Sequence, residues 1–222
     1  MTMPHQRPTG RTRIPEFPAV RNAATPRRRT AFIGAVILLL GLAACSAHKA
    51  PFVLQDISGL VPRLQFNMLD DNGHAVTAAD YRGKIVLLYF GYTHCPDACP
   101  TTLTILKGVM ANLGKAAADV DVLFVSVDPK RDTGAALKTY LGYFDPAFIG
   151  LRSDSDSPLN ALTKRYRIAY HLDPPDRNGD YTVEHSNAIF IFGRDGEASL
   201  LATSSDTVQT ITHDLRLLLG SG

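Results

Sequence analysis

Two cysteines, four positions apart and each followed by proline, constrain this chain more than any other feature of its sequence. They stand in GYTHCPDACP, Gly91–Pro100, directly after the apolar run Lys84–Phe90. A proline inside a helix removes a hydrogen bond and clashes with the carbonyl four residues before it. A helix is therefore expected to begin at about Pro100, with Cys99 at its cap and Cys95 on the preceding loop. Free N–H groups and the macrodipole at that end of the helix favour thiolate over thiol.

The cysteine motif alone leaves three interpretations open: a disulfide, a redox pair and two arms of a metal site. Three residues, Pro96–Ala98, separate the cysteines, whereas redox domains of the thioredoxin type have two. The wider spacing lets the sulfurs spread around a metal, yet it permits a disulfide if the two Cα atoms lie within about 7 Å. A disulfide that closes so short a loop adds little stability, which disfavours a purely structural bond.

The rest of the chain predicts an α/β domain. Lys84–Phe90 and Val120–Asp128 are continuous apolar runs, as in strands buried on both faces. Apolar residues recur at helical spacing up to Leu113, and Gly114 is expected to stop that helix. The further expected elements are a hairpin around DDNG (70–73), helices over 132–144 and 155–168, a hairpin over 188–203, and a last helix capped by Asp206.

The order of these elements predicts a thioredoxin-like fold. A parallel β-α-β unit, followed by a β-hairpin and a final helix, is the thioredoxin arrangement. This chain adds an N-terminal β-hairpin extension and an insertion before the third core strand.

A histidine is expected beside the two cysteines. His185 stands in VEHSNAIFIF, immediately before a core strand. In the thioredoxin fold this loop packs against the cysteine loop and normally carries a cis-proline, but residues 183–188 contain no proline. Two thiolates and one imidazole form a soft, three-coordinate set that suits Cu(I), with Zn(II) second. The alternative is a histidine that fixes the loop through hydrogen bonds.

The N-terminal segment has the pattern of an export signal. Arg27–Arg29 precede the apolar run 31–44, which at about fourteen residues is short for a hydrocarbon core of roughly 30 Å and typical of a signal peptide. The run ends in LAAC, Leu42–Cys45, which resembles the lipobox of bacterial lipoproteins, where the cysteine is acylated and becomes the mature N-terminus. We therefore expect lipidation at Cys45. The alternative is a signal anchor that stays uncut.

These signals divide the chain into a lipoprotein-type signal segment (1–44), a tether (45–62) and a folded domain (63–222). The signal segment holds seven of the 23 basic residues and one of the 21 acidic ones, so residues 45–222 carry a net charge of about −4. This part has no basic footprint of the kind that binds nucleic acid. We expect the domain in the bacterial cell envelope, attached to a membrane by lipid and facing the periplasm, a compartment that permits a disulfide.

Three motifs in order resemble the Sco/SenC family. They are TxCPxxCP at Thr93–Pro100, SVDPKRDT at Ser126–Thr133 and HSNAIFIFGRDG at His185–Gly196, and the similarity covers residues 60–220. The resemblance implies a thioredoxin fold and a membrane-anchored domain that binds copper and helps to assemble the copper site of cytochrome c oxidase. Most members of that family are anchored by a transmembrane helix, whereas Cys45 predicts a lipid anchor in this chain. The choice between the inner and the outer membrane therefore stays open.

The resemblance also implies roles for individual residues. Cys95, Cys99 and His185 fall on the metal ligands of the family, and copper is expected as Cu(I) first and Cu(II) second. The motif aspartate of the family matches Asp128, which we expect near the site at the end of the second core strand.

We interpret the chain as a copper chaperone rather than a turnover enzyme. Its expected partner is the copper-bearing subunit of cytochrome c oxidase or another copper or thiol protein. The alternative is a thiol–disulfide oxidoreductase, in which Cys95 and Cys99 are a redox-active pair that keeps the cysteines of a copper-site protein reduced. That alternative needs little from His185.

Overall fold

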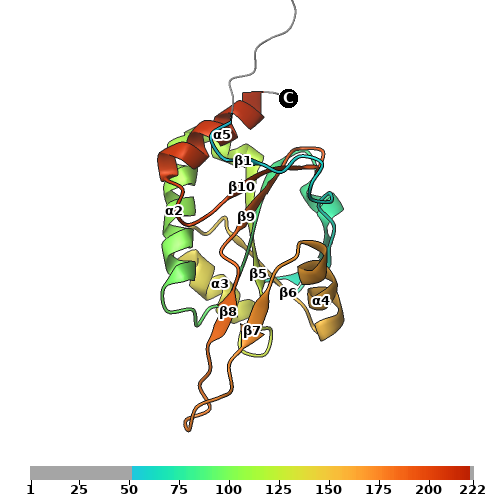
Figure 1. Ribbon diagram of the computed structural model, residues 1–222, viewed down its shortest axis with the longest axis vertical. Helices are drawn as coiled ribbons and strands as arrows, with labels where there is room; N and C mark the ends of the chain where they lie inside the picture. The colour runs from blue at the N-terminus through green and yellow to red at the C-terminus, as the bar shows by residue number, and fades with distance from the viewer. Residues whose placement is uncertain (1–51, 221–222) are drawn as a thin grey trace, which may run out of the picture. The chain divides into compact units, whose positions relative to one another are not determined.

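A mixed eight-stranded sheet forms the centre of the domain in the computed structural model, which describes residues 52–220 (Figure 1). The strand order is β1-β10-β9-β4-β5-β6-β2-β3. In chain order the strands are β1 (Gln55–Asp56), β2 (Asn67–Asp70), β3 (Ala75–Thr77), β4 (Ile85–Gly91), β5 (Val120–Ser126), β6 (Ile149–Arg152), β9 (Ile189–Phe192) and β10 (Ala198–Ala202). A separate two-stranded ribbon pairs β7 (Tyr170–Leu172) with β8 (Val183–His185).

Helices cover both faces of this sheet. The α-helices are α2 (Ala98–Leu113), α3 (Gly134–Gly142), α4 (Asp156–Arg165) and α5 (Val208–Gly220), and two 3-10 helices are η2 (Ala78–Tyr81) and η3 (Gly114–Asp119). Across residues 52–220 no helix combines the length and apolarity that a bilayer crossing requires. The predicted signal segment, Cys45 and the start of the predicted tether lie outside the described residues.

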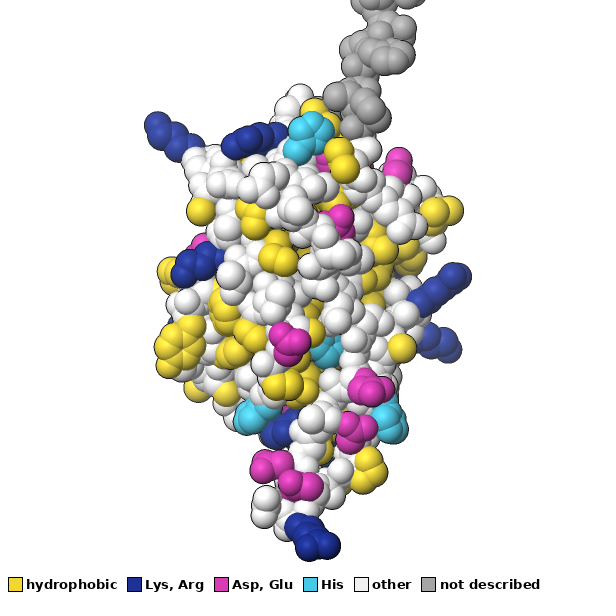
Figure 2. Space-filling model, turned by 60° about the vertical axis from the view of Figure 1, so that its left-hand side comes forward, with side chains coloured by type: hydrophobic (Ala, Val, Ile, Leu, Met, Phe, Trp, Pro, Cys, Tyr) yellow, Lys and Arg dark blue, Asp and Glu magenta, His cyan; other side chains and the backbone are white. Residues whose placement is uncertain are grey.

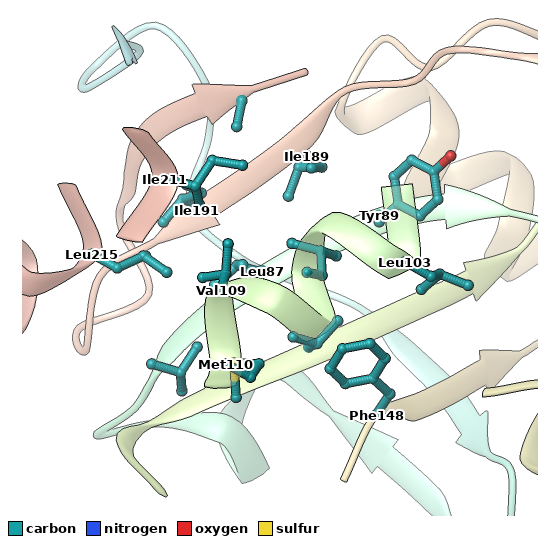
Figure 3. Close-up of a cluster of buried hydrophobic side chains, with 14 of the residues drawn as sticks. Leu87, Tyr89, Leu103, Val109, Met110, Phe148, Ile189, Ile191, Ile211 and Leu215 are labelled. Carbon is teal, nitrogen blue, oxygen red and sulfur yellow. The ribbon is translucent and has the colours of Figure 1, made fainter. Parts of the chain in front are cut away.

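Strand β4 contributes side chains to two hydrophobic clusters, one on each face of the sheet. All seven of its residues are buried, which explains its uninterrupted apolar sequence. Successive side chains of a strand point to opposite faces. Leu87 and Tyr89 therefore join the cluster under α2 and α5 (Figure 3), while Val86 and Leu88 join the cluster on the α4 side.

The predicted core topology is confirmed. Strand β4 pairs in parallel with β5 from Ile85–Val120 to Gly91–Ser126, with α2 as the crossover. Strand β9 then pairs antiparallel with both β4 and β10, and α5 follows. The predicted hairpin before the core is β2–β3, which joins the sheet beside β6. The predicted insertion contains β6, α4 and the ribbon.

Helix boundaries differ from the prediction, and three of the differences involve residues named in the sequence analysis. Helix α2 begins at Ala98, so Pro100 is its third residue, and because the first turn has no intrahelical partners for its N–H groups, the proline removes no bond there. Gly114 ends the α-helix, but the chain continues as η3. Before α5, Thr207 Oγ1 accepts from the Thr210 N–H at 3.1 Å, whereas Asp206 accepts from the Thr203 N–H at 2.8 Å. Asp206 thus closes a turn rather than capping the helix.

Part of the segment predicted as a tether is folded. Strand β1 pairs antiparallel with β10, and Leu54 and Ile57 on either side of it are buried. The backbone N–H groups of Val53 and Leu54 donate to Asp214 Oδ2 on α5, at 2.9 and 2.7 Å. This stretch therefore belongs to the domain. A two-residue strand has too few side chains to show an alternating pattern, so the sequence gives no sign of it.

Candidate metal centre

Cys95, Cys99 and His185 converge, as the sequence predicted for a metal site. Cys99 Sγ lies 3.3 Å from His185 Nε2, and the ligand atoms of all three residues lie within 4.8 Å of one another. Among residues 52–220 this is the one group of three or more such donors within reach of a common ion. Both cysteines are free thiols here. Two sulfurs and one imidazole nitrogen at this separation suit copper.

A close approach of α2 to the end of β4 fixes the buried cysteine. Cys99 is fully buried, and its backbone N–H donates to Cys95 Sγ at 3.4 Å. Gly91, the last residue of β4, leaves the space for this: a Cβ there would lie 2.7 Å from Cys99 Sγ and 2.8 Å from the Phe124 ring. The glycine therefore permits the contact between strand and thiol.

The two thiols are inequivalent. The hydrogen bond from Cys99 is the largest influence on Cys95, and with the Cys99 N–H and His185 it lowers the pKa of Cys95 to about 4 against the cost of burial. The same bond, together with burial, raises the pKa of Cys99. Cys95, which is half-buried, is therefore the first sulfur to lose its proton and the one that an incoming molecule meets.

The imidazole of His185 is oriented with Nε2 toward the sulfurs. Its Nδ1 lies 3.1 Å from the Ser186 carbonyl oxygen, which can only accept, so Nδ1 donates there and Nε2 is the nitrogen that faces Cys99. A hydrogen bond at the far nitrogen is the usual way to hold a ligating histidine. The rings of Tyr89 and Tyr92 pack edge-on to the imidazole, with centroids 6.1 and 5.9 Å away.

Asp128 is not one of the three donors but bonds to residues that hold the ribbon in place. It is buried just after β5, accepts from the Tyr181 hydroxyl at 2.8 Å and accepts from Arg131 Nε. Arg131 also donates to the Tyr181 carbonyl at 2.9 Å and stacks over the Tyr181 ring. Since Tyr181 belongs to the connection between β7 and β8, Asp128 supports the ribbon that carries His185.

Asp132 is the residue that the sequence analysis missed. The sequence offers both Asp132 and Thr133 as caps of α3, and Thr133 is the one that accepts from the Ala136 N–H. Asp132 is instead fully buried and accepts from the hydroxyls of Thr93 and Ser126, each at 2.6 Å, which joins the cysteine loop to β5. Burial raises its pKa. Thr93 lies just after β4, and Ser126 is the last residue of β5. These two hydroxyl residues at the ends of buried strands were the sequence signal that could have revealed the role of Asp132.

A groove lined by three carboxylates and by Arg131 lies beside the cysteine loop. The groove has a volume of about 460 Å³ and lies between His94 and Pro96 of the cysteine loop and the β7–β8 connection. Figure 2 shows acidic side chains along the lower end of this face, where the ribbon lies in Figure 1. The carboxylates that line the groove are Asp173, Asp176 and Asp180. A molecule that enters this groove beside His94 and Pro96 meets the three carboxylates and the Arg131 guanidinium.

Comparison with known proteins identifies the family. The model of the SCO1/SenC family matches residues 60–220. This chain belongs to the SCO1/SenC family. The mitochondrial SCO2 homolog of Bos taurus is 35% identical over 214 residues, which are 94% of this chain and 79% of that protein. An SCO2-like protein of Rickettsia felis is 31% identical over 166 residues, 74% of this chain and 80% of its own length. The chain spans 60% of the mouse SCO2 homolog.

Solved SCO1/SenC structures have the same fold. ScoI of Bradyrhizobium japonicum with copper bound is 38% identical, with a TM-score of 0.66 over 71% of this chain and 99% of that one. Yeast Sco1 with copper bound is 28% identical, with a TM-score of 0.67 over 73% of this chain and 90% of that one. The predicted thioredoxin-like fold is thereby confirmed.

Proposed function

We propose that this protein binds one copper ion through Cys95, Cys99 and His185 and delivers it to the copper site of cytochrome c oxidase. The convergence of the three donors within 4.8 Å carries the proposal. Thiolates and imidazole favour Cu(I) over harder cations. Two solved relatives are described with copper bound, and the same family relationship supports an oxidase subunit as recipient.

The three ligands differ in protonation and in exposure, so they are expected to have different roles in copper binding and release. Cys95 already favours the thiolate, whereas Cys99 must lose its proton when copper enters, so loading releases protons and weakens on acidification. Because three protein donors leave room around the ion, a donor of the recipient can enter before the protein ligands leave. Cys95 and His185 are half-buried and Cys99 is fully buried, so exchange is expected to begin on the side of Cys95 and His185.

Substitution of the histidine tests the copper site. His185→Ala removes one of three donors, and we expect Cu(I) affinity, measured by competition with a chromophoric chelator, to fall by at least tenfold. His171→Ala is the matched control, because His171 lies on the same ribbon, is exposed and belongs to no donor group. An unchanged affinity in His185→Ala would reject the three-ligand site.

A second candidate function follows from the inequivalent thiols. The half-buried, low-pKa Cys95 can attack a disulfide of a copper-site protein, which releases one partner thiolate and forms a mixed disulfide. Cys99 then attacks Cys95, the partner leaves with both sulfurs reduced, and the chain ends with a Cys95–Cys99 disulfide. Two electrons pass to the partner. In this case His185→Ala keeps the rate of exchange with a cysteine peptide, and Cys99→Ala accumulates the mixed disulfide.

Attachment to the cell envelope is a separate proposal. The LAAC sequence at Leu42–Cys45 favours a lipidated Cys45, which would attach the protein to a membrane that faces the periplasm. Stable attachment by lipid takes two anchoring signals or acyl chains, because a single chain binds a membrane only weakly. Cys45→Ser is expected to move the protein from the membrane fraction into the soluble envelope fraction. Retention of the substituted protein in the membrane, with the apolar run 31–44 still attached, contradicts lipidation.

A further inference from the structure

Tyr89 places a hydroxyl group against the buried cysteine. It is fully buried on β4, and its hydroxyl donates to Cys99 Sγ at 3.7 Å. Ile85 and Leu87 precede it on the same face of the strand and are aliphatic. Figure 3 shows the Tyr89 hydroxyl pointing away from the labelled aliphatic side chains. The polar atom thus stands where the hydrophobic cluster meets the sulfur.

The ring of Tyr89 also touches the third donor. It packs edge-on to the His185 imidazole, with ring centroids 6.1 Å apart, and it leans against the Phe124 ring at 5.9 Å. One side chain on a central strand therefore contacts two of the three donors. The strand is paired on both sides, with β5 and β9, so this contact is made from an interior strand of the sheet.

We propose that Tyr89 tunes the sulfur of Cys99, so that its hydrogen bond sets both the reduction potential of the Cys95–Cys99 pair and the donor strength of Cys99 toward copper. The inference rests on the proposed function in taking these cysteines as the working pair. A thiol or thiolate accepts a hydrogen bond better than a disulfide sulfur does, so the bond stabilises the reduced pair. Hydrogen bonds to a coordinated sulfur are a recognised means of adjusting a metal site.

The hydroxyl of Tyr89 remains a donor under working conditions. Burial is the largest influence on it and raises its pKa far above the ordinary value for tyrosine, with the nearby Cys99 adding to the effect. The tyrosine therefore stays protonated at neutral pH, and the hydrogen bond does not depend on its ionisation.

The test removes one oxygen atom and keeps the ring. In Tyr89→Phe the equilibrium constant for reduction of the metal-free Cys95–Cys99 disulfide should fall by about three- to tenfold. This corresponds to a midpoint potential lower by about 15–30 mV, since a tenfold change equals 29.6 mV for a two-electron couple. The sulfur-to-copper absorption band of the Cu(II)-loaded protein should move to longer wavelength, because the sulfur gains electron density. Tyr92→Phe is the matched control, since Tyr92 is equally buried and packs on His185, but its hydroxyl accepts from the Val183 N–H.

The metal-free potential separates this inference from the copper proposal, because it needs no bound ion. Equal potentials in Tyr89→Phe and Tyr92→Phe would overturn the role of Tyr89 even if copper binding is intact. If Tyr89→Phe does not fold, site-specific replacement of Tyr89 by 3-fluorotyrosine keeps the shape and strengthens the donor. The midpoint should then rise, and an unchanged midpoint also overturns the inference.

Discussion

Cys99 Sγ and His185 Nε2 lie 3.3 Å apart although 86 positions separate the residues in the chain. The sheet produces this meeting. Strands β4 and β9 are antiparallel, with Tyr89 opposite Ile189, so the loop that leaves the end of β4 lies beside the segment that enters β9. Cys95 and Cys99 follow the first strand and His185 precedes the second. The three donors therefore meet at the end of the sheet where β4 ends and β9 begins.

Replacement of Cys99 tests the inequivalence of the thiols. Because the hydrogen bond from Cys99 is the largest cause of the low pKa of Cys95, we expect Cys99→Ala to move that pKa from about 4 toward its ordinary value of 9.0. The pH dependence of alkylation by iodoacetamide, in the reduced and metal-free protein, measures the change. A midpoint equal to that of the unsubstituted protein would show that Cys99 does not activate Cys95.

The same pair predicts how stability varies with pH. The pKa of Cys95 is lower in the folded protein than the ordinary 9.0, so its contribution to stability is complete above pH 9 and is lost as the pH falls through about 4. Urea midpoints of the reduced protein should rise with pH within this window, and the rise should be smaller in Cys99→Ala. An identical slope in both proteins contradicts the assignment.

Gly91→Ala tests the close approach of β4 to the buried thiol. The added Cβ would lie 2.7 Å from Cys99 Sγ and 2.8 Å from the Phe124 ring, so one of them must move, at a cost of about 1–3 kcal/mol. We expect lower stability in urea and weaker copper binding. Gly142→Ala at the end of α3 is the control, because a Cβ there meets nothing within 4 Å. Equal stability of both variants would show that the site has room for a methyl group.

Much of the fold could be predicted from the sequence because its central elements are strongly patterned. The uninterrupted apolar run of β4, together with Pro96 and Pro100, made it possible to predict a strand, a cysteine loop and a helix in this order. His185 could be chosen because it immediately precedes β9, a strand with a clear apolar signal. The short strands β1, β6 and β7 were not predicted, because two to four residues carry no readable alternation and depend on pairing with distant partners.

The supporting carboxylates were harder to predict than the donors. Asp132 follows a strand and precedes a helix, a position that local rules assign to a cap. Its actual partners, Thr93 and Ser126, come from two other parts of the chain. Burial of a carboxylate with donors from distant segments is a tertiary property that local sequence does not encode.

Asp128 and Asp132 are expected to support different donors. Asp132→Ala leaves the Thr93 and Ser126 hydroxyls without their acceptor and should loosen the cysteine loop, whereas Asp128→Ala should loosen the ribbon through Arg131. Each loss of a buried acceptor costs about 1–3 kcal/mol.

Hydrogen exchange distinguishes the two variants. Faster exchange is expected at residues 92–97 in Asp132→Ala and at residues 181–185 in Asp128→Ala, with weaker copper binding in both. Asp121→Ala is the control, since Asp121 pairs with the partly exposed Lys84 at 2.9 Å and such a pair contributes about 1 kcal/mol or less. Identical exchange patterns in the two variants would refute separate roles.

Asp214 is expected to hold the N-terminal edge of the domain without affecting the metal centre. It is fully buried on α5, and its Oδ2 accepts from the N–H groups of Val53 and Leu54. Asp214→Ala should lower the free energy of unfolding by about 1–3 kcal/mol and speed exchange of the Leu54 amide. Copper affinity should stay unchanged, because β1 and α5 lie at the opposite end of the domain from the ribbon (Figure 1). His213→Ala, which removes a half-exposed partner of the other oxygen, should leave the Leu54 amide protected. If Leu54 exchanges equally slowly in Asp214→Ala, pairing of β1 with β10 alone holds the segment.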